Sequence, residues 1–469
     1  MAFHSLHFLL FFPLVLGLTW TLRRNLLTRN LILLVASYYF YMSFHAVYGL
    51  LIFAMTGIDF LVAGRIAESA NHQTRRAWLT LSVTSNLGML GLFKYYNFFL
   101  DNVTAATGSS AALYHSLALP LGISFFTFEA LSYTIDVYRG HLVPTKSFLK
   151  FCLFISFFPR MVAGPIIRAS HFLPQLELAP TFNDRAAESG LGRMLLGLFK
   201  KLCIADVLGA GIVDPIFADP SRGGWSLTLL AMYAYAFQIY YDFSGYSDVA
   251  LGAARMLGFD LPENFNRPYL ATSIRDFWRR WHISLSTWLR DYLYVPLGGG
   301  RGTVWSTARN LTLVMLLGGL WHGASWMFVL WGAIHGGLLA AGRLFHAATG
   351  IEADRSDQSG VTRLARIVIT FHLAALCFLV FRAPDMTTLS NLLNGVWMNS
   401  ASGITIPPLA YVALLGGALL EWTPRGIVSA VGETYLRLPS PLQAGVVTVG
   451  LLLFGVFGGS GNPFIYFQF

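Results

Sequence analysis

Apolar runs recur along this chain, and many of them are long enough to cross a lipid bilayer. A helix needs about 20 mostly apolar residues to span a hydrocarbon core of about 30 Å. Hydrophobic residues make up 55% of the 469 positions and charged residues only 12%, whereas a soluble domain usually carries about 25% charged residues. So few charges cannot cover a globular surface. We therefore predict an all-α polytopic membrane protein, in one membrane-embedded domain over residues 1–469.

Basic loops and polar breaks divide these runs into about eleven transmembrane spans or half-spans. The runs cover residues 6–22, 31–64, 77–100, 116–138, 151–167, 190–213, 225–241, 310–342, 367–382, 404–422 and 441–458. Arg160 and two prolines interrupt 151–167, which predicts a broken or re-entrant helix that faces protein. Lys200 and Lys201 lie in the centre of 190–213, so we expect part of that segment at the membrane interface.

Charge and cysteine content exclude several classes of site. The net charge of +9 is typical of arginines and lysines in cytoplasmic loops and at lipid headgroups. Lysines and arginines form no run with interleaved aromatic residues, so we expect no nucleic-acid partner. Cys152, Cys203 and Cys377 lie far apart in apolar sequence, without metal-ligand spacing. We therefore expect no metal.

Residues 274–292 have a clear helical period. The apolar members are Ile274, Phe277, Trp278, Trp281, Leu285, Trp288, Leu289 and Tyr292. At about 100° per residue they fill an arc of about 120°. With arginines on the opposite face, the segment predicts one amphipathic helix lying in the headgroup plane. His282 lies at the edge of the stripe, where the pattern fits both a boundary histidine bonded to a neighbour and a catalytic histidine.

His322 lies deep in the apolar run that follows Arg309. If Arg309 marks the cytoplasmic side, a helix rising about 1.5 Å per residue carries His322 about 20 Å into the membrane. An ionisable group at that depth is a functional candidate, although a histidine bonded to a neighbouring helix gives the same pattern. His335, which precedes two glycines, is a further candidate.

Four acidic residues lie in or beside apolar runs: Glu129, Asp136, Asp242 and Asp248. A proton-coupled transporter uses carboxylates at such positions. Ion pairs with Arg160 or Arg168 that stabilise the helix bundle are the alternative.

Several motifs together resemble the membrane-bound O-acyltransferase family, and within it the bacterial alginate O-acetyltransferase branch. They are FWRRWHISLSTWLRDY (277–292), GLWHG (319–323), YDFSGYSD (241–248), ENFNRPY (263–269), FKYYN (93–97) and PFIYFQF (463–469). The likeness covers most of the chain and is densest over 237–337, whereas residues 384–440 carry no matched motif.

The resemblance implies an all-helical fold with interfacial helices around a central funnel. It also implies that His322 corresponds to the family's catalytic histidine, and His282 to the second histidine of the polysaccharide and teichoic acid branches. We interpret His322 as a general base, because imidazole suits proton transfer near neutral pH. His282 is then its orienting partner or a contact to the donor. Candidate substrate contacts are Arg279, Arg280, Trp281, Arg290 and Trp321; lipid headgroups are the alternative partners of the arginines.

The leading hypothesis is an enzyme that moves acetyl groups across the bacterial inner membrane for O-acetylation of an exopolysaccharide of alginate or cellulose type. The donor is an acyl compound such as acetyl-CoA, used as co-substrate with no bound cofactor. The resemblance suggests as partners periplasmic proteins that accept or transfer the acetyl group, within a polysaccharide synthesis and secretion complex. Peptidoglycan O-acetylation and teichoic acid D-alanylation are alternatives within the enzyme class. A transporter of an acyl carrier or ion, and a scaffold for a secretion complex, are alternatives outside it.

Overall fold

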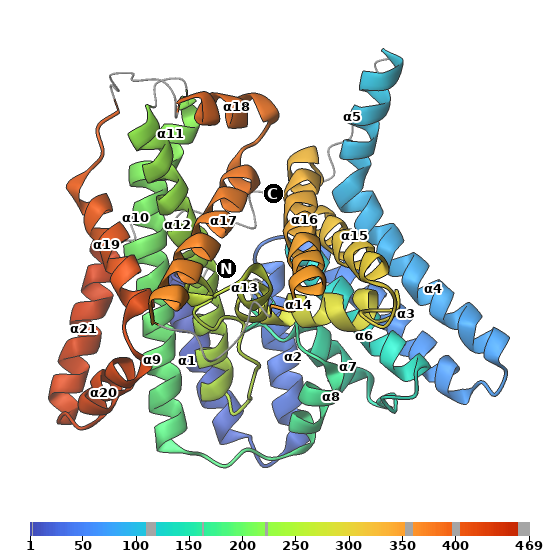
Figure 1. Ribbon diagram of the computed structural model, residues 1–469. Helices are drawn as coiled ribbons and strands as arrows, with labels where there is room; N and C mark the ends of the chain where they lie inside the picture. The colour runs from blue at the N-terminus through green and yellow to red at the C-terminus, as the bar shows by residue number, and fades with distance from the viewer. Residues whose placement is uncertain are drawn as a thin grey trace. The chain divides into compact units, whose positions relative to one another are not determined.

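The computed structural model describes residues 1, 3–108, 119–161, 164–220, 224–351, 360–395 and 404–457. Every element in this part of the chain is a helix (Figure 1), which confirms the predicted all-α class. The terminal motif at 463–469 and residues 116–118 of one expected span lie outside the described residues. The chain forms two compact units. That they make up one membrane-embedded domain over 1–469 stays a prediction.

The first unit comprises residues 1–193 and 249–262. Its helices are α1 (Leu6–Thr21), α2 (Leu26–Met42), α3 (Ala46–Glu68), α4 (His72–Leu90), η1 (Gly91–Tyr95), α5 (Tyr96–Thr107), α6 (Ile123–Tyr138), α7 (Phe148–Ser156), α8 (Ala169–Phe172) and η2 (Leu173–Glu177). Helix α3 packs against α2, α4, α6 and α7. Several helices begin at a residue whose side-chain oxygen accepts a backbone N–H, as Ser5, Asn25 and Ser147 do, which satisfies a donor that the first turn leaves open.

The second unit comprises residues 194–248 and 263–469. Its elements are α9 (Asp184–Phe199), which begins in the first unit, η3 (Lys200–Ala205), α10 (Asp206–Leu208), η4 (Gly209–Val213), α11 (Asp214–Ala218), α12 (Trp225–Met256), which ends in the first unit, η6 (Pro268–Leu270), α13 (Ile274–Arg280), α14 (Ile283–Leu289), η7 (Arg290–Tyr294), α15 (Val304–His322), α16 (Trp326–Thr349), α17 (Gly360–Arg382), α18 (Met386–Gly395), α19 (Pro408–Trp422), α20 (Arg425–Leu436) and α21 (Ser440–Phe457). The run at 310–342 is therefore two helices, and its break follows His322.

Three helices in the described part of the chain are long and apolar enough to cross a bilayer: α3, α16 and α17. Helices α1, α2 and α19 are apolar but shorter. Large apolar side chains are exposed on these helices, as Leu10 on α1 and Leu415 on α19 are at 69% and 66%. Lipid is the solvent that such side chains need.

A buried ion pair holds the non-helical segment after α7 in the first unit. Helix α7 ends at Ser156, and the described residues from 157 to 168 form no helix, as the interruption by Arg160 and prolines predicted. The Arg160 guanidinium donates to the carboxylate of Glu129 and to the carbonyl oxygens of Phe154 and Ile155. Glu129 also accepts the backbone N–H of Ile167 at 3.0 Å. The ion-pair interpretation of Glu129 is thus confirmed.

The acids of the YDFSGYSD motif pair with lysines of the second unit, and the predicted pairing with Arg160 or Arg168 is wrong for them. Lys201 Nζ lies 2.8 Å from Asp206 and 2.5 Å from Asp242, and Lys200 Nζ lies 2.6 Å from Asp248. Lys201 is buried within the protein, and the expected place of part of 190–213 at the membrane interface stays a prediction. A lysine this deep needs carboxylates around it, because an unpaired buried charge is very costly.

Glycines allow α15 and α16 to pack with their backbones in contact, side by side as Figure 1 shows. A Cβ atom on Gly319 or Gly332 would collide with a carbonyl oxygen of the facing helix, and a Cβ on Gly336 would lie 2.8 Å from Cα of Thr312. Small residues at such contacts are typical of helix pairs in membranes. The close packing fixes the end of α15, where His322 lies, against α16.

Replacement of Gly336 by alanine tests this contact, and Gly337 offers a matched control. We expect Gly336→Ala to lower the free energy of unfolding by about 1–3 kcal/mol, because the added methyl forces the helices apart. Gly337→Ala has open space around its Cβ, and alanine is preferred to glycine in helices by about 1 kcal/mol. Thermal and chemical denaturation in detergent measure the stability of both variants. Equal stability of the two variants would contradict the close packing.

Candidate active site

His322 is the last residue of α15 and is enclosed by aromatic rings. The residue is 5% exposed. Ring centroids lie 5.0 Å away for Trp321, 5.0 Å for Trp331 of α16 and 5.2 Å for Phe381 of α17, and each ring meets the imidazole nearly edge to face. The helix runs unbroken from Arg309 to His322, as the depth argument assumed. The position of His322 within a membrane stays a prediction.

His282 lies at a break that the sequence did not predict. The expected single helix over 274–292 is two short helices, α13 and α14, and His282 stands between them in the left-handed region at φ 42° and ψ 57°. This conformation is uncommon for a residue with a Cβ and persists only where the surroundings impose it. The turn places the imidazole inside the protein, fully buried, and not at the edge of an exposed stripe.

The ENFNRPY segment holds this turn in place. Asn264 accepts the backbone N–H of Ile283 through its carbonyl oxygen at 2.9 Å. Its side-chain oxygen accepts the Ser284 hydroxyl at 2.9 Å. Asn266 donates its backbone N–H to the carbonyl oxygen of Arg280 at 2.9 Å. The loop therefore fixes the backbone on both sides of His282, which is how the strained conformation is maintained.

The apolar stripe of 274–292 faces the protein interior. Ile274, Phe277, Trp281, Leu285, Trp288, Leu289 and Tyr292 are all buried. The ring centroid of Trp281, for example, lies 4.9 Å from that of Phe378 and 5.5 Å from that of Phe277. This face therefore contacts other parts of the protein, and the placement of the segment in the headgroup plane stays a prediction. Period alone cannot tell a stripe that meets lipid from one that meets other helices.

Trp321 lies between the two histidines. Its ring centroid is 6.0 Å from that of His282 and 5.0 Å from that of His322. The ring of Phe243 on α12 packs edge to face on that of His282, with centroids 4.6 Å apart. Burial lowers the pKa of His282 to about 3, so this imidazole is neutral at physiological pH and can only donate or accept a hydrogen bond. The structure thus gathers His282, Trp321 and His322 in one enclosed aromatic site.

Comparison with known proteins identifies the family of this chain. The sequence profile of the membrane-bound O-acyltransferase family matches residues 78–365, a range that contains both histidines. A relative from Azotobacter vinelandii named "Probable alginate O-acetylase AlgI" is 40% identical over 100% of both chains. The chain belongs to the membrane-bound O-acyltransferase family.

Other members of the family differ in the acceptor that their names state. The peptidoglycan O-acetyltransferase of Helicobacter pylori is 36% identical over 81% of this chain and 76% of its own length. The teichoic acid D-alanyltransferase of Streptococcus thermophilus is 32% identical over 59% of this chain and 69% of its own length. Acyl transfer to a hydroxyl is the chemistry that a membrane-bound O-acyltransferase performs, and an imidazole is its most suitable base.

The arginines that we predicted as substrate contacts lie in different surroundings. Arg279 and Arg290 are exposed, and Arg290 Nε lies 2.8 Å from Asp291. Arg280 is half-buried and lies 2.9 Å from Asp276, four residues before it. Trp281 and Trp321 are both buried. Substrate contact by any of these residues stays a prediction.

Four residues near the histidines were not singled out from the sequence: Phe243, Asn264, Trp331 and Phe381. Trp331 had a usable signal, because it precedes His335 by four residues and therefore shares a helix face with it. Phe243 and Asn264 lie inside matched motifs. Phe381 is far from His322 along the chain, and no local pattern indicates their contact.

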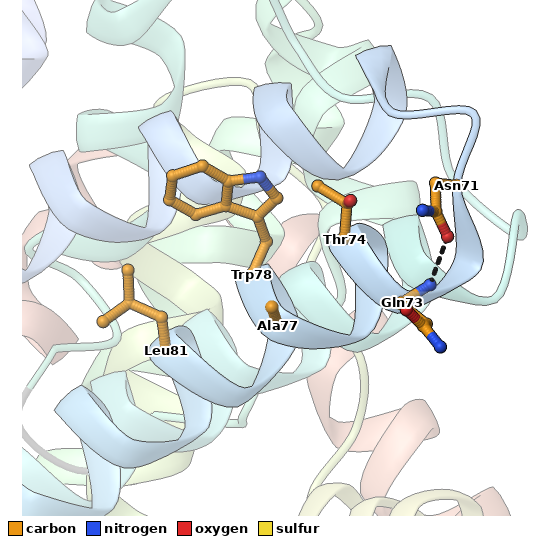
Figure 2. Close-up of a pocket in the computed structure, with 6 residues that line it drawn as sticks. All are labelled: Asn71, Gln73, Thr74, Ala77, Trp78 and Leu81. Carbon is orange, nitrogen blue, oxygen red and sulfur yellow. Dashed lines mark hydrogen bonds between the residues drawn. The ribbon is translucent and has the colours of Figure 1, made fainter.

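A surface pocket of the first unit lacks the chemistry of this site. Figure 2 shows it along the first turns of α4, lined by Asn71, Gln73, Thr74, Ala77, Trp78 and Leu81. The Asn71 side chain accepts the backbone N–H of Gln73 at 2.8 Å, which caps the helix. No lining residue is a general base, so we assign no acyl transfer to this pocket.

Proposed function

We propose that this protein transfers acetyl groups across the bacterial inner membrane for O-acetylation of an alginate-type exopolysaccharide. The observation that carries the proposal is the 40% identity to a relative named as an alginate O-acetylase, over the whole length of both chains. The enclosed site of the second unit supports it, because a base protected from water suits acyl transfer from a reactive donor. Cellulose is the alternative polymer.

His322 is the general base in this proposal. It takes the proton of the acceptor hydroxyl while the hydroxyl oxygen attacks the carbonyl carbon of the acyl donor. His282, neutral and fixed by its backbone, acts through Trp321 as a positioning residue or contacts the donor. The donor is a thioester such as acetyl-CoA, used as a co-substrate, and Arg279, Arg280 and Arg290 attract its phosphates from the cytoplasmic face.

The finer architecture is part of the same proposal. About eleven spans or half-spans carry the chain repeatedly through the membrane, and a funnel brings donor and acceptor to His322. Periplasmic proteins receive the acetyl group and deliver it to the polymer, within a synthesis and secretion complex.

A gene deletion tests the proposal. We expect the deleted strain to secrete its polymer without ester-linked acetyl groups, and the wild-type gene to restore them, because no acetyl reaches the periplasm without the transferase. Mass spectrometry and NMR of the secreted polymer measure the acetyl content. Thiol release from acetyl-CoA by the purified protein separates the enzyme from a transporter, which moves its cargo without cleaving it. Unchanged acetylation in the deletion strain would contradict the proposal.

Peptidoglycan O-acetylation is the second candidate, favoured by the 36% identity to the Helicobacter pylori enzyme. The same strains separate the two candidates when muropeptides are analysed beside the secreted polymer. Loss of acetyl groups from muropeptides alone would support the second candidate. Loss of ester-linked D-alanine would support the more distant teichoic acid activity, for which the named relative is 32% identical.

A further inference from the structure

His335 is a third buried histidine of the second unit, and neither of the matched histidine motifs includes it. It lies on α16 and is completely enclosed. Trp331, one turn earlier on the same helix, is 2% exposed, and the two ring centroids lie 4.7 Å apart. Phe277 stacks at 6.3 Å on His335. A polar ring in such a place needs hydrogen-bond partners for both nitrogens.

One nitrogen of His335 has its partner. The Trp278 indole Nε1–H donates to His335 Nδ1 at 3.3 Å. An indole nitrogen can only donate, so Nδ1 must be the acceptor, and the proton of the neutral ring is on Nε2. The protein itself therefore selects the tautomer and turns Nε2–H into a fixed donor.

The other two donors at this place are the N–H groups of His335 Nε2 and Trp331 Nε1. No hydrogen-bond partner for His335 Nε2 or for Trp331 Nε1 lies among the residues that the structure describes, although both atoms are buried. A buried donor without an acceptor destabilises the folded protein. Two such donors on neighbouring rings can be satisfied by an acceptor atom that a substrate brings to them.

The place of the donors suggests which acceptor that is. The Trp331 ring meets the His322 ring edge to face, with centroids 5.0 Å apart, and its centroid lies 4.7 Å from that of His335. Its indole thus connects the proposed base to His335. In acyl transfer, the atom that gains negative charge beside the base is the carbonyl oxygen of the acyl group, and N–H donors fixed in advance stabilise that charge.

We propose that Trp331 Nε1–H and His335 Nε2–H bind the acyl carbonyl oxygen and stabilise the oxyanion of the tetrahedral intermediate. This rests on the proposed function. The acceptor hydroxyl oxygen forms a bond to the carbonyl carbon while its proton passes to His322, and the carbonyl π electrons move to the oxygen held by the two donors. Collapse of the intermediate breaks the C–S bond, and the thiol leaves with the proton from His322.

Kinetics of conservative variants test the donors one at a time. Trp331→Phe keeps an aromatic ring and loses the N–H. His335→Asn keeps an acceptor near Nδ1 for Trp278 and loses the donor at Nε2, whereas the amide of His335→Gln reaches the Nε2 position. We expect Trp331→Phe and His335→Asn each to lower kcat about 100-fold with KM little changed. His335→Gln should recover most of the kcat that His335→Asn loses.

Controls on the same helix separate this role from general damage to α16. Trp326→Phe removes an indole N–H at an exposed position, and His346→Asn replaces a histidine whose hydrogen bond lies at the surface. Both should retain wild-type kcat. Melting temperatures close to wild type in Trp331→Phe would show that its loss of kcat is not a loss of fold.

A spectroscopic readout reports on the carbonyl directly. Acetyl-CoA labelled with ¹³C at the carbonyl is bound to His322→Gln, which turns over too slowly to consume it, and the infrared carbonyl frequency is compared with that in His322→Gln/His335→Asn. Hydrogen bonds lower this frequency, so we expect it to rise in the double variant. An unchanged frequency, or wild-type kcat in both Trp331→Phe and His335→Asn beside an inactive His322→Gln, would overturn the inference alone. A wild-type protein that releases no thiol from acetyl-CoA would overturn the proposed function as well.

Discussion

His322→Gln is expected to abolish acetyl transfer while the protein still folds and inserts. Loss of a general base lowers the rate of proton transfer by about 100-fold to 10,000-fold, and an enclosed site gives water little access to replace it. Glutamine is close to histidine in volume, so the rings of Trp321, Trp331 and Phe381 keep their contacts. The measurements are the acetyl content of the polymer in a complemented deletion strain and thiol release by the purified variant.

A matched variant separates the role of His322 from the general effect of replacing a histidine in this unit. His346 lies on α16 and makes its hydrogen bond to the carbonyl oxygen of Ile351 at the surface. His346→Gln should retain acetyl transfer and the melting temperature of the wild type. Wild-type acetylation by His322→Gln would exclude this residue as the base and leave the scaffold hypothesis, in which only deletion of the whole chain has an effect.

The sequence predicted the helical class and the continuous helix from Arg309 to His322, because both depend on local composition, whereas the break after His322 within 310–342 was not predicted. Apolar length selects helices in a bilayer, and the residues from Arg309 to His322 contain no break. The buried charge at Arg160 was also predictable, since an arginine between prolines in an apolar run needs a partner. Glu129 was one of the four acids in or beside apolar runs that could pair with Arg160.

The turn at His282 could not be predicted in the same way. The helical period of 274–292 continues across it. The break depends on hydrogen bonds that Asn264 accepts and Asn266 donates, and both residues precede the segment. Likewise, the partners of Asp242 and Asp248 are Lys201 and Lys200, whose neighbourhood was expected at the interface. A buried lysine is identified by the carboxylates that surround it, and long-range packing decides where these lie.

Removal of the guanidinium at Arg160 is expected to destabilise the first unit more than any surface change. Arg160→Met leaves the Glu129 carboxylate fully buried, where the backbone N–H of Ile167 still donates to it. The carbonyl oxygens of Phe154 and Ile155 lose their donor too. Breaking a buried pair in this way costs about 3–5 kcal/mol. Chemical denaturation in detergent measures the free energy of unfolding.

The pair between Lys150 and Glu177 is the matched control, because it lies in the same unit at 3.0 Å but is partly exposed. Lys150→Met should cost at most about 1 kcal/mol. Arg160→Met/Glu129→Gln should recover part of the loss, since a neutral amide at 129 is cheaper to bury than a carboxylate and still accepts from Ile167. If the double variant were as unstable as Arg160→Met, the uncompensated charge would not be the cause. The loss would then come from the carbonyl oxygens of 154 and 155, and Arg160 would serve chiefly to satisfy the backbone where α7 ends.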